Sequence, residues 1–231
     1  MFKNILIATC LLVTSIASQA ALISHYGYER ESTSNIVKGG GLEWLMWDVT
    51  KGMSISQALA AYKSDGWSLA NNNKMAMLFN RFNFGKSKWS SSLGINQSNN
   101  SPWGAQEHKG FLDLFGITYI SDNLCNENKK RWCYASDDPY SYSVALYGTS
   151  FSVYGASVSD DATYTEINSK YQMTAGAALW EYNWSEWESA NYVGVALVRQ
   201  AVAEVPLPAS ITLLMLGLVT LCLRRRKLAR S

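Results

Sequence analysis

The sequence has little histidine, and this scarcity limits the chemistry open to it. Only two of its 231 residues are histidines, His25 and His108. Neither stands one helical turn from a second metal ligand or beside an evident nucleophile, so the sequence offers no zinc site and no base-activated nucleophile. We expect both histidines to be solvated at the surface, and we predict no metal, no cofactor and no catalytic residue.

Positive charge is also scarce between the two ends of the chain. Of the 20 Lys and Arg residues, Lys3 lies in the N-terminal segment and five lie near the C-terminus. The part of the chain between them has the remaining 14, against 18 Asp and Glu residues. The middle of the chain therefore carries a net charge of about −4. Nucleic-acid-binding proteins present basic surfaces, so the composition argues against a nucleic-acid partner.

Cysteine is limited to four residues, two of which lie in apolar terminal runs. The remaining pair, Cys125 and Cys133, flanks the segment NENKKRW. A redox motif would need closer spacing, and a zinc site would need more ligands. In an exported protein, this pair predicts one disulfide that closes a short loop.

Residues 1–20 have the layout of a secretory signal peptide. Lys3 precedes an apolar run at residues 5–16, and small residues ending in Ser18-Gln19-Ala20 provide the cleavage site for signal peptidase. The run is shorter than the ~20 residues that a membrane-spanning helix needs. We therefore predict export and cleavage after Ala20.

The other end of the chain predicts a single transmembrane helix at residues 209–223. The stretch without charge begins at Val205 and, as a helix, would reach about 28 Å, just enough to cross a bilayer core of ~30 Å. The positive-inside rule keeps the following basic cluster in the cytoplasm and places residues 21–204 outside. This cluster consists of Arg224, Arg225, Arg226 and Lys227.

The same end resembles the PEP-CTERM protein-sorting signal of Gram-negative bacteria, in its VPLPA variant. The resemblance rests on the order of motif, hydrophobic helix and basic cluster, and the motif residues are Val205, Pro206, Leu207, Pro208 and Ala209. It implies that an exosortase, an integral membrane transpeptidase-like enzyme, cleaves near the motif and passes the protein from the inner membrane to the cell surface or into exopolysaccharide. Leu207 stands where many members have Glu, which leaves the exosortase subtype open. An uncleaved single-pass anchor is the alternative.

Residues 21–204 are predicted to form one α+β domain, with two early helices and a mainly antiparallel sheet built from both ends of the domain. Ser54 and Gln57 stand at capping-box spacing before the first helix, and an apolar stripe from Met75 to Phe82 predicts the second. The segment 85–110, rich in Ser, Asn and Gly, predicts a long loop or an insertion, followed by a brief helical turn in FLDLFG. The apolar run at residues 192–200 suits one central strand.

Residues 41–45, 54–62, 66–70 and 195–199 resemble the DUF1566-type ectodomains of exported bacterial proteins. That group is thought to be related to the C-type lectin-like fold, so the resemblance implies such a fold here. Ser68 and Asn71 stand where Arg and Thr usually appear, and the four-cysteine lectin framework is missing. This resemblance carries no catalytic residues over.

Clustered acidic residues could serve either a calcium site or a hydrolase. Asp137-Asp138 and Asp160-Asp161 lack the regular ligand alternation of a calcium loop, and we interpret them as exposed turns. Glu181, Glu186 and Glu188 could serve a glycan hydrolase, which needs two carboxylates about 5 to 10 Å apart. The sequence does not supply that distance.

Aromatic residues are the most suggestive feature, because all 9 Trp and 13 Tyr residues lie between the two terminal segments. Flat rings with hydrogen-bonding neighbours suit stacking on sugar rings, although aromatic residues also fill cores and pair across strands. The leading hypothesis is a non-enzymatic structural or adhesive protein of the cell surface or exopolysaccharide. A carbohydrate-binding module and an acidic-residue hydrolase are the alternatives, the former using Trp180, Tyr182, Trp184 and Trp187.

Overall fold

A computed structural model of the chain describes residues 20–94, 96–102, 105–121, 140–149, 151–167 and 170–201. The chain divides into two units, Met1–Ala201 and Val202–Ser231, and every described residue belongs to the first. The predicted signal peptide except Ala20, the Cys125 and Cys133 pair, and the whole segment 205–231 lie outside the described residues. Within the described part, no helix is both long and apolar enough to cross a membrane.

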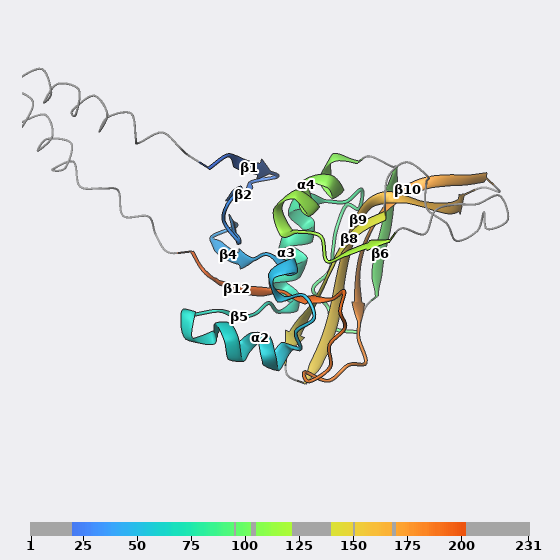
Figure 1. The fold of residues 1–231 in the computed structure, drawn as a ribbon. Coiled ribbons are helices and arrows are strands. Elements are labelled where there is room, and N and C mark those ends of the chain that lie inside the picture. Colours follow the sequence, from blue (N-terminus) through green and yellow to red (C-terminus); the bar gives the residue numbers. More distant parts are fainter. Residues whose placement is uncertain are drawn as a thin grey trace, which may run out of the picture. The chain divides into compact units, whose positions relative to one another are not determined.

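The first sheet is antiparallel and joins the beginning and the end of the domain (Figure 1). The last strand pairs Val198 with Trp44, next to the N-terminal strands. This arrangement confirms an α+β fold with a sheet built from both ends. In spatial order the strands are β1 (Leu22–His25), β2 (Tyr28–Glu31), β3 (Ile36–Gly39), β4 (Leu42–Leu45), β12 (Leu197–Gln200) and β5 (Ser68–Leu69).

The second sheet is built by long hairpins from the later part of the chain, and its pairings are antiparallel except for that of β11 with β8. In spatial order its strands are β11 (Gly194–Val195), β8 (Tyr140–Thr149), β9 (Ser152–Ile167), β10 (Lys170–Glu181) and β6 (Gln97–Pro102), and β7 (Tyr119–Ser121) also pairs with β8. The apolar run at 192–200 is therefore divided between the two sheets. The prediction of one strand there was wrong, because Ala196 separates β11 from β12.

The two early helices form as predicted, and local chemistry explains where each begins. The Ser54 hydroxyl accepts the Gln57 backbone N–H, and the Gln57 side chain accepts the Ser54 N–H, which completes a capping box before α2 (Ile55–Tyr62). The Asn71 side chain accepts the Lys74 N–H and caps α3 (Asn72–Phe82). Short 3-10 turns follow β4 and α2, namely η1 (Trp47–Thr50) and η2 (Lys63–Asp65).

The polar segment 85–110 is more ordered than its composition predicts. It contains strand β6 and the beginning of α4 (Gln106–Phe115), which is a helix of ten residues rather than a brief turn. Ser98 and Asn100 lie on an exposed face of β6, and Gln97 on its other face is buried but satisfied by two hydrogen bonds to the Ser90 backbone. The prediction of a long loop or an insertion, which rested on composition alone, was therefore wrong for this segment.

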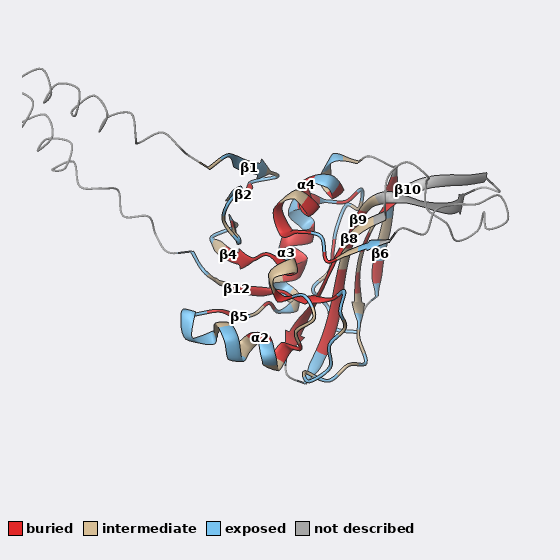
Figure 2. Cartoon of the chain, viewed as in Figure 1, coloured by how far each residue is buried: buried red, intermediate tan, exposed pale blue. Residues whose placement is uncertain are grey.

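Helices α3 and α4 lie between the two sheets, and α4 packs against β8, β9 and β10 (Figure 1). The buried residues there form a largely aromatic core (Figure 2). Phe111 and Phe115 stack with ring centroids 4.4 Å apart, and Trp47 meets Phe111 edge-on at 5.0 Å. Truncating one such ring to Ala would cost about 3–5 kcal/mol, so this core anchors the second sheet firmly.

Candidate functional site

The two faces of the second sheet have different surroundings. Ala175, Ala177 and Leu179 of β10 are buried toward the aromatic core, where α4 covers this inner face. Because side chains alternate along a strand, Ala178 and Trp180 point to the opposite, outer face. Both are only partly buried, so part of the outer face is accessible to a ligand.

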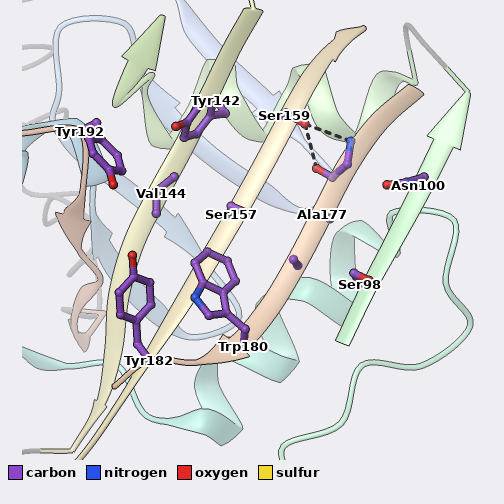
Figure 3. Close-up of a pocket in the computed structure, with 12 residues that line it drawn as sticks. Ser98, Asn100, Tyr142, Val144, Ser157, Ser159, Ala177, Trp180, Tyr182 and Tyr192 are labelled. Carbon is purple, nitrogen blue, oxygen red and sulfur yellow. Dashed lines mark hydrogen bonds between the residues drawn. The ribbon is translucent and has the colours of Figure 1, made fainter. Parts of the chain in front are cut away.

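A groove of about 370 Å³ lies on this outer face (Figure 3). Its floor contains a row of directly paired residues that crosses four strands, from Ser98 through Ala178 and Ser157 to Val144. Ser98, Ala178 and Ser157 have small side chains and Val144 is buried, which leaves space above the sheet. The volume falls within the range of small-molecule binding sites.

Trp180 forms one wall of the groove by lying over a glycine. A Cβ atom at Gly155, the residue paired with Trp180 on β9, would overlap the indole ring. The missing side chain therefore lets the indole lie across the neighbouring strand. The Tyr182 ring follows at 5.7 Å from Trp180 and continues the wall.

A cluster of tyrosines forms the second wall, on the side of β8. Tyr119 of β7 packs against Tyr142 at 4.8 Å and against Tyr192 at 5.9 Å. Tyr142 and Tyr192 line the groove directly. The loop between β10 and β11 brings Tyr182 and Tyr192 to this face, and the Tyr182 N–H donates to the Val153 carbonyl at 2.9 Å.

None of the described residues that line the groove has a charged side chain. Burial raises the pKa of Tyr182, and the neighbouring Tyr192 phenol raises it further, so Tyr182 stays neutral at physiological pH. The polar groups offered to a ligand are hydroxyl and amide groups, which both donate and accept hydrogen bonds. This chemistry suits an uncharged, hydroxyl-rich ligand with apolar faces.

The four predicted aromatic contact residues do not act as one surface. Trp180, Tyr182 and Trp184 all pack against a second apolar cluster. Trp180 and Tyr182 also line the groove, whereas Trp184 meets the Tyr182 ring edge-on at 4.5 Å and does not line it. Trp187 is 73% exposed and does not line the groove. The sequence therefore located two of the aromatic residues that the structure brings together.

Sequence reasoning missed the residues contributed by other strands, above all Tyr142, Tyr192 and Ser157. A signal was present in the alternation of Ser, Gly and Ala with larger residues in SVYGASVS and GAALWEY, which leaves one face of β9 and β10 without bulk. Only the pairing of the strands shows that these small residues adjoin one another.

The acidic candidates receive no support as a catalytic or metal site. Glu181, Glu186 and Glu188 do not line the groove. Asp160 lies within strand β9, so its interpretation as an exposed turn was wrong, and Asp137 and Asp138 lie outside the described residues. Within the described ranges, no group of three His, Cys, Asp or Glu residues could hold a metal ion.

The prediction of a solvated His108 was also wrong. Its side chain is fully buried on α4, against Phe84 with ring centroids 4.9 Å apart. His25 is partly buried, 3.6 Å from the Asp113 carboxylate. Neither histidine lines the groove.

The C-terminal segment matches a known family model. Residues 204–227 match the model described as the PEP-CTERM protein-sorting motif. The chain carries a PEP-CTERM motif. No curated protein and no solved structure matches the chain.

The PEP-CTERM match confirms the resemblance drawn from the sequence, and it includes both the motif at 205–209 and the basic cluster at 224–227. A PEP-CTERM motif implies export through exosortase-type sorting to the cell surface. Every groove residue precedes residue 204, so the PEP-CTERM motif and the groove occupy separate parts of the chain.

Proposed function

We propose that this protein is a non-enzymatic protein of the cell surface or exopolysaccharide that binds a glycan chain in the groove of the second sheet. The PEP-CTERM motif implies export and surface sorting. The observation that carries the glycan proposal is the groove itself, whose small-residue floor is bounded by Trp180, Tyr182, Tyr142 and Tyr192.

The groove chemistry supports a glycan because sugar rings present both apolar C–H faces and hydroxyl groups. Trp and Tyr supply large rigid surfaces with a polar end, which suits sites that are apolar on one side and wet on the other. Ser98, Ser157 and Asn100 supply short hydrogen-bonding groups along the floor.

The hydrolase alternative is weaker than binding. A glycoside hydrolase places two carboxyl groups beside the scissile bond, typically about 5 to 10 Å apart. No carboxylate is present among the described residues that line the groove, and the three glutamates around residues 181–188 lie outside it. Binding without turnover is therefore the proposed activity.

Anchoring and processing complete the proposal. Before processing, the helix predicted at 209–223 would hold the protein in the inner membrane, and an exosortase would then remove it. We also propose the C-type lectin-like arrangement that the DUF1566 resemblance implies. The pairing of β12 with β4, which joins the two ends of the domain, supports it. Intact-mass measurement of surface-extracted protein tests the processing step, and a mature species that retains the basic cluster 224–227 would show that the helix is a permanent anchor.

The glycan proposal is tested with exported protein and exopolysaccharide from the same cells. Trp180→Ala should weaken binding by roughly tenfold or more, because it removes a central aromatic wall. Trp187→Ala is the matched control, since Trp187 is a nearby, exposed tryptophan outside the groove. Equal affinities of wild type and Trp180→Ala, with both variants folded by circular dichroism, would refute the proposal.

A further inference from the structure

The groove floor has a second row of paired residues, and this row contains an irregularity in the sheet. The row runs from Asn100 through Gly176 and Ser159 to Tyr142. The register between β9 and β10 shifts between Thr174 and Gly176. Such bulges redirect side chains locally and are common next to binding sites.

Ser159 fixes this irregularity from within the groove. Its hydroxyl accepts the Gly176 N–H at 3.1 Å and donates to the Gly176 carbonyl at 3.4 Å (Figure 3). Ser159 is therefore engaged with the backbone, and the ligand-facing hydroxyl of β9 is that of Ser157 in the neighbouring row.

Gly176 keeps the middle of this row open. A Cβ atom there would lie 3.3 Å from the Ser159 hydroxyl and 3.5 Å from the Asn100 side-chain oxygen. A larger side chain at position 176 would fill the space above the floor that a ligand needs. The first row crosses four strands spaced about 4.8 Å apart, so the floor extends over roughly 14 Å along this row, whereas the Tyr142 ring closes the second row on β8.

Among the residues whose side chains the structure describes, this elongated floor offers no charged partner for a ligand. A carboxylate or sulfate removed from water requires a cation or several strong donors. The groove is lined by neither Lys nor Arg, and the chain between the terminal segments is acidic, with a net charge of about −4. An acidic glycan would therefore meet both an unpaired burial cost and long-range repulsion.

We infer that the groove takes an uncharged polysaccharide, with its rings lying across β6, β10, β9 and β8, over Gly176 and Ser157 and against Trp180. This inference rests on the proposed glycan-binding function and adds the class of glycan. Selection against uronic-acid and sulfated polymers follows from the missing cations. Room for a chain of sugars follows from the small side chains of Ser98, Ala178 and Ser157 and from Gly176.

The test compares polymers and variants by affinity electrophoresis of the exported protein. The neutral probes are dextran, a soluble β-glucan and galactomannan, and the acidic probes are alginate and polygalacturonate. Wild type should bind at least one neutral polymer and neither acidic one, with little dependence on salt, because ion pairs contribute nothing.

Two variants change the groove in different ways. Gly176→Val fills the floor and should weaken neutral binding by roughly tenfold. Ser157→Lys should also weaken neutral binding and should add alginate binding that disappears at high salt. Ser152→Lys is the matched control, since it adds the same charge to an exposed position of β9 outside the groove.

The outcomes separate this inference from the proposed function. Wild-type binding to an acidic polymer that is lost in Trp180→Ala would overturn the uncharged class and leave glycan binding intact. Binding to no polymer and to no native exopolysaccharide would overturn both. If the protein is a dimer that Gly176→Val converts to a monomer, the groove binds a second copy of the chain and the inference is overturned. Unchanged binding to neutral polymers in folded Gly176→Val and Ser157→Lys would overturn it as well.

Discussion

Acid should destabilise this protein through His108. The imidazole is fully buried on α4 and its two ring nitrogens make no hydrogen bond to any described residue. Burial lowers the pKa of His108 from 6.5 to about 4, because the charged form loses its hydration in the apolar surroundings. The protein must therefore fold around a neutral histidine.

The sign and size of the effect follow from these two pKa values. Below pH 6.5 the unfolded chain binds a proton at His108 that the folded protein binds only below about pH 4, so stability falls as the pH decreases through this window. At about 1.4 kcal/mol per pH unit, the full loss is about 3 kcal/mol, of which about 2 kcal/mol is already lost at pH 5. This is a large part of the 5–15 kcal/mol that stabilises a typical domain.

Urea unfolding of wild type and His108→Leu between pH 7 and pH 4 measures this contribution. The free energy of unfolding of the variant should fall less than that of wild type, by about 3 kcal/mol over the window. At pH 7 the variant should be as stable as wild type or more so, because it removes two unpaired polar atoms from the core.

The control is His25→Gln, which removes the other, partly exposed histidine and should preserve the acid-sensitive step. Parallel pH curves for wild type and His108→Leu would refute the reasoning. They would show that His108 in the folded protein gains a partner or solvent that the described structure does not provide.

Two further predictions concern stability, and a third concerns the disulfide. Gly194→Ala should lower the free energy of unfolding by several kcal/mol, because its Cβ would overlap the Trp47 backbone carbonyl. Gly52→Ala is the control, since its Cβ meets open space and only its positive φ should cost about 1 kcal/mol. Similar losses of stability in the two variants would refute the steric argument. Ser54→Ala should cost about 1 kcal/mol by removing the capping box, and an unchanged melting temperature would contradict this. Alkylation without reductant should label neither Cys125 nor Cys133, and labelling of both would remove the predicted disulfide.

Local signals in the sequence predicted the parts of the fold that local physics determines. The Ser54 and Gln57 pair marked the start of α2, and the stripe ending at Phe82 marked the buried face of α3. Both features act within one or two helical turns. Their success required no knowledge of which strands pair.

The misjudged parts depend on contacts between distant segments. Polar QEHKG suggested a loop, yet the fold buries His108 and extends α4, since the aromatic core and the second sheet enclose this helix. The groove likewise needs residues from β6, β8, β9 and β10 in one register. A strand of small residues gives no local sign of whether its open face will be covered.

The connection between the two sheets explains why sorting and binding can be treated as separate properties. The chain leaves the second sheet at β11, passes Ala196 and completes the first sheet with β12, directly before the PEP-CTERM match at 204–227. Cleavage near 205–209 would therefore remove no side chain of the groove and no strand of the sheet that carries it. The motif implies export and surface sorting, and the proposed binding rests on the groove alone. An experiment that disrupts one should leave the other measurable.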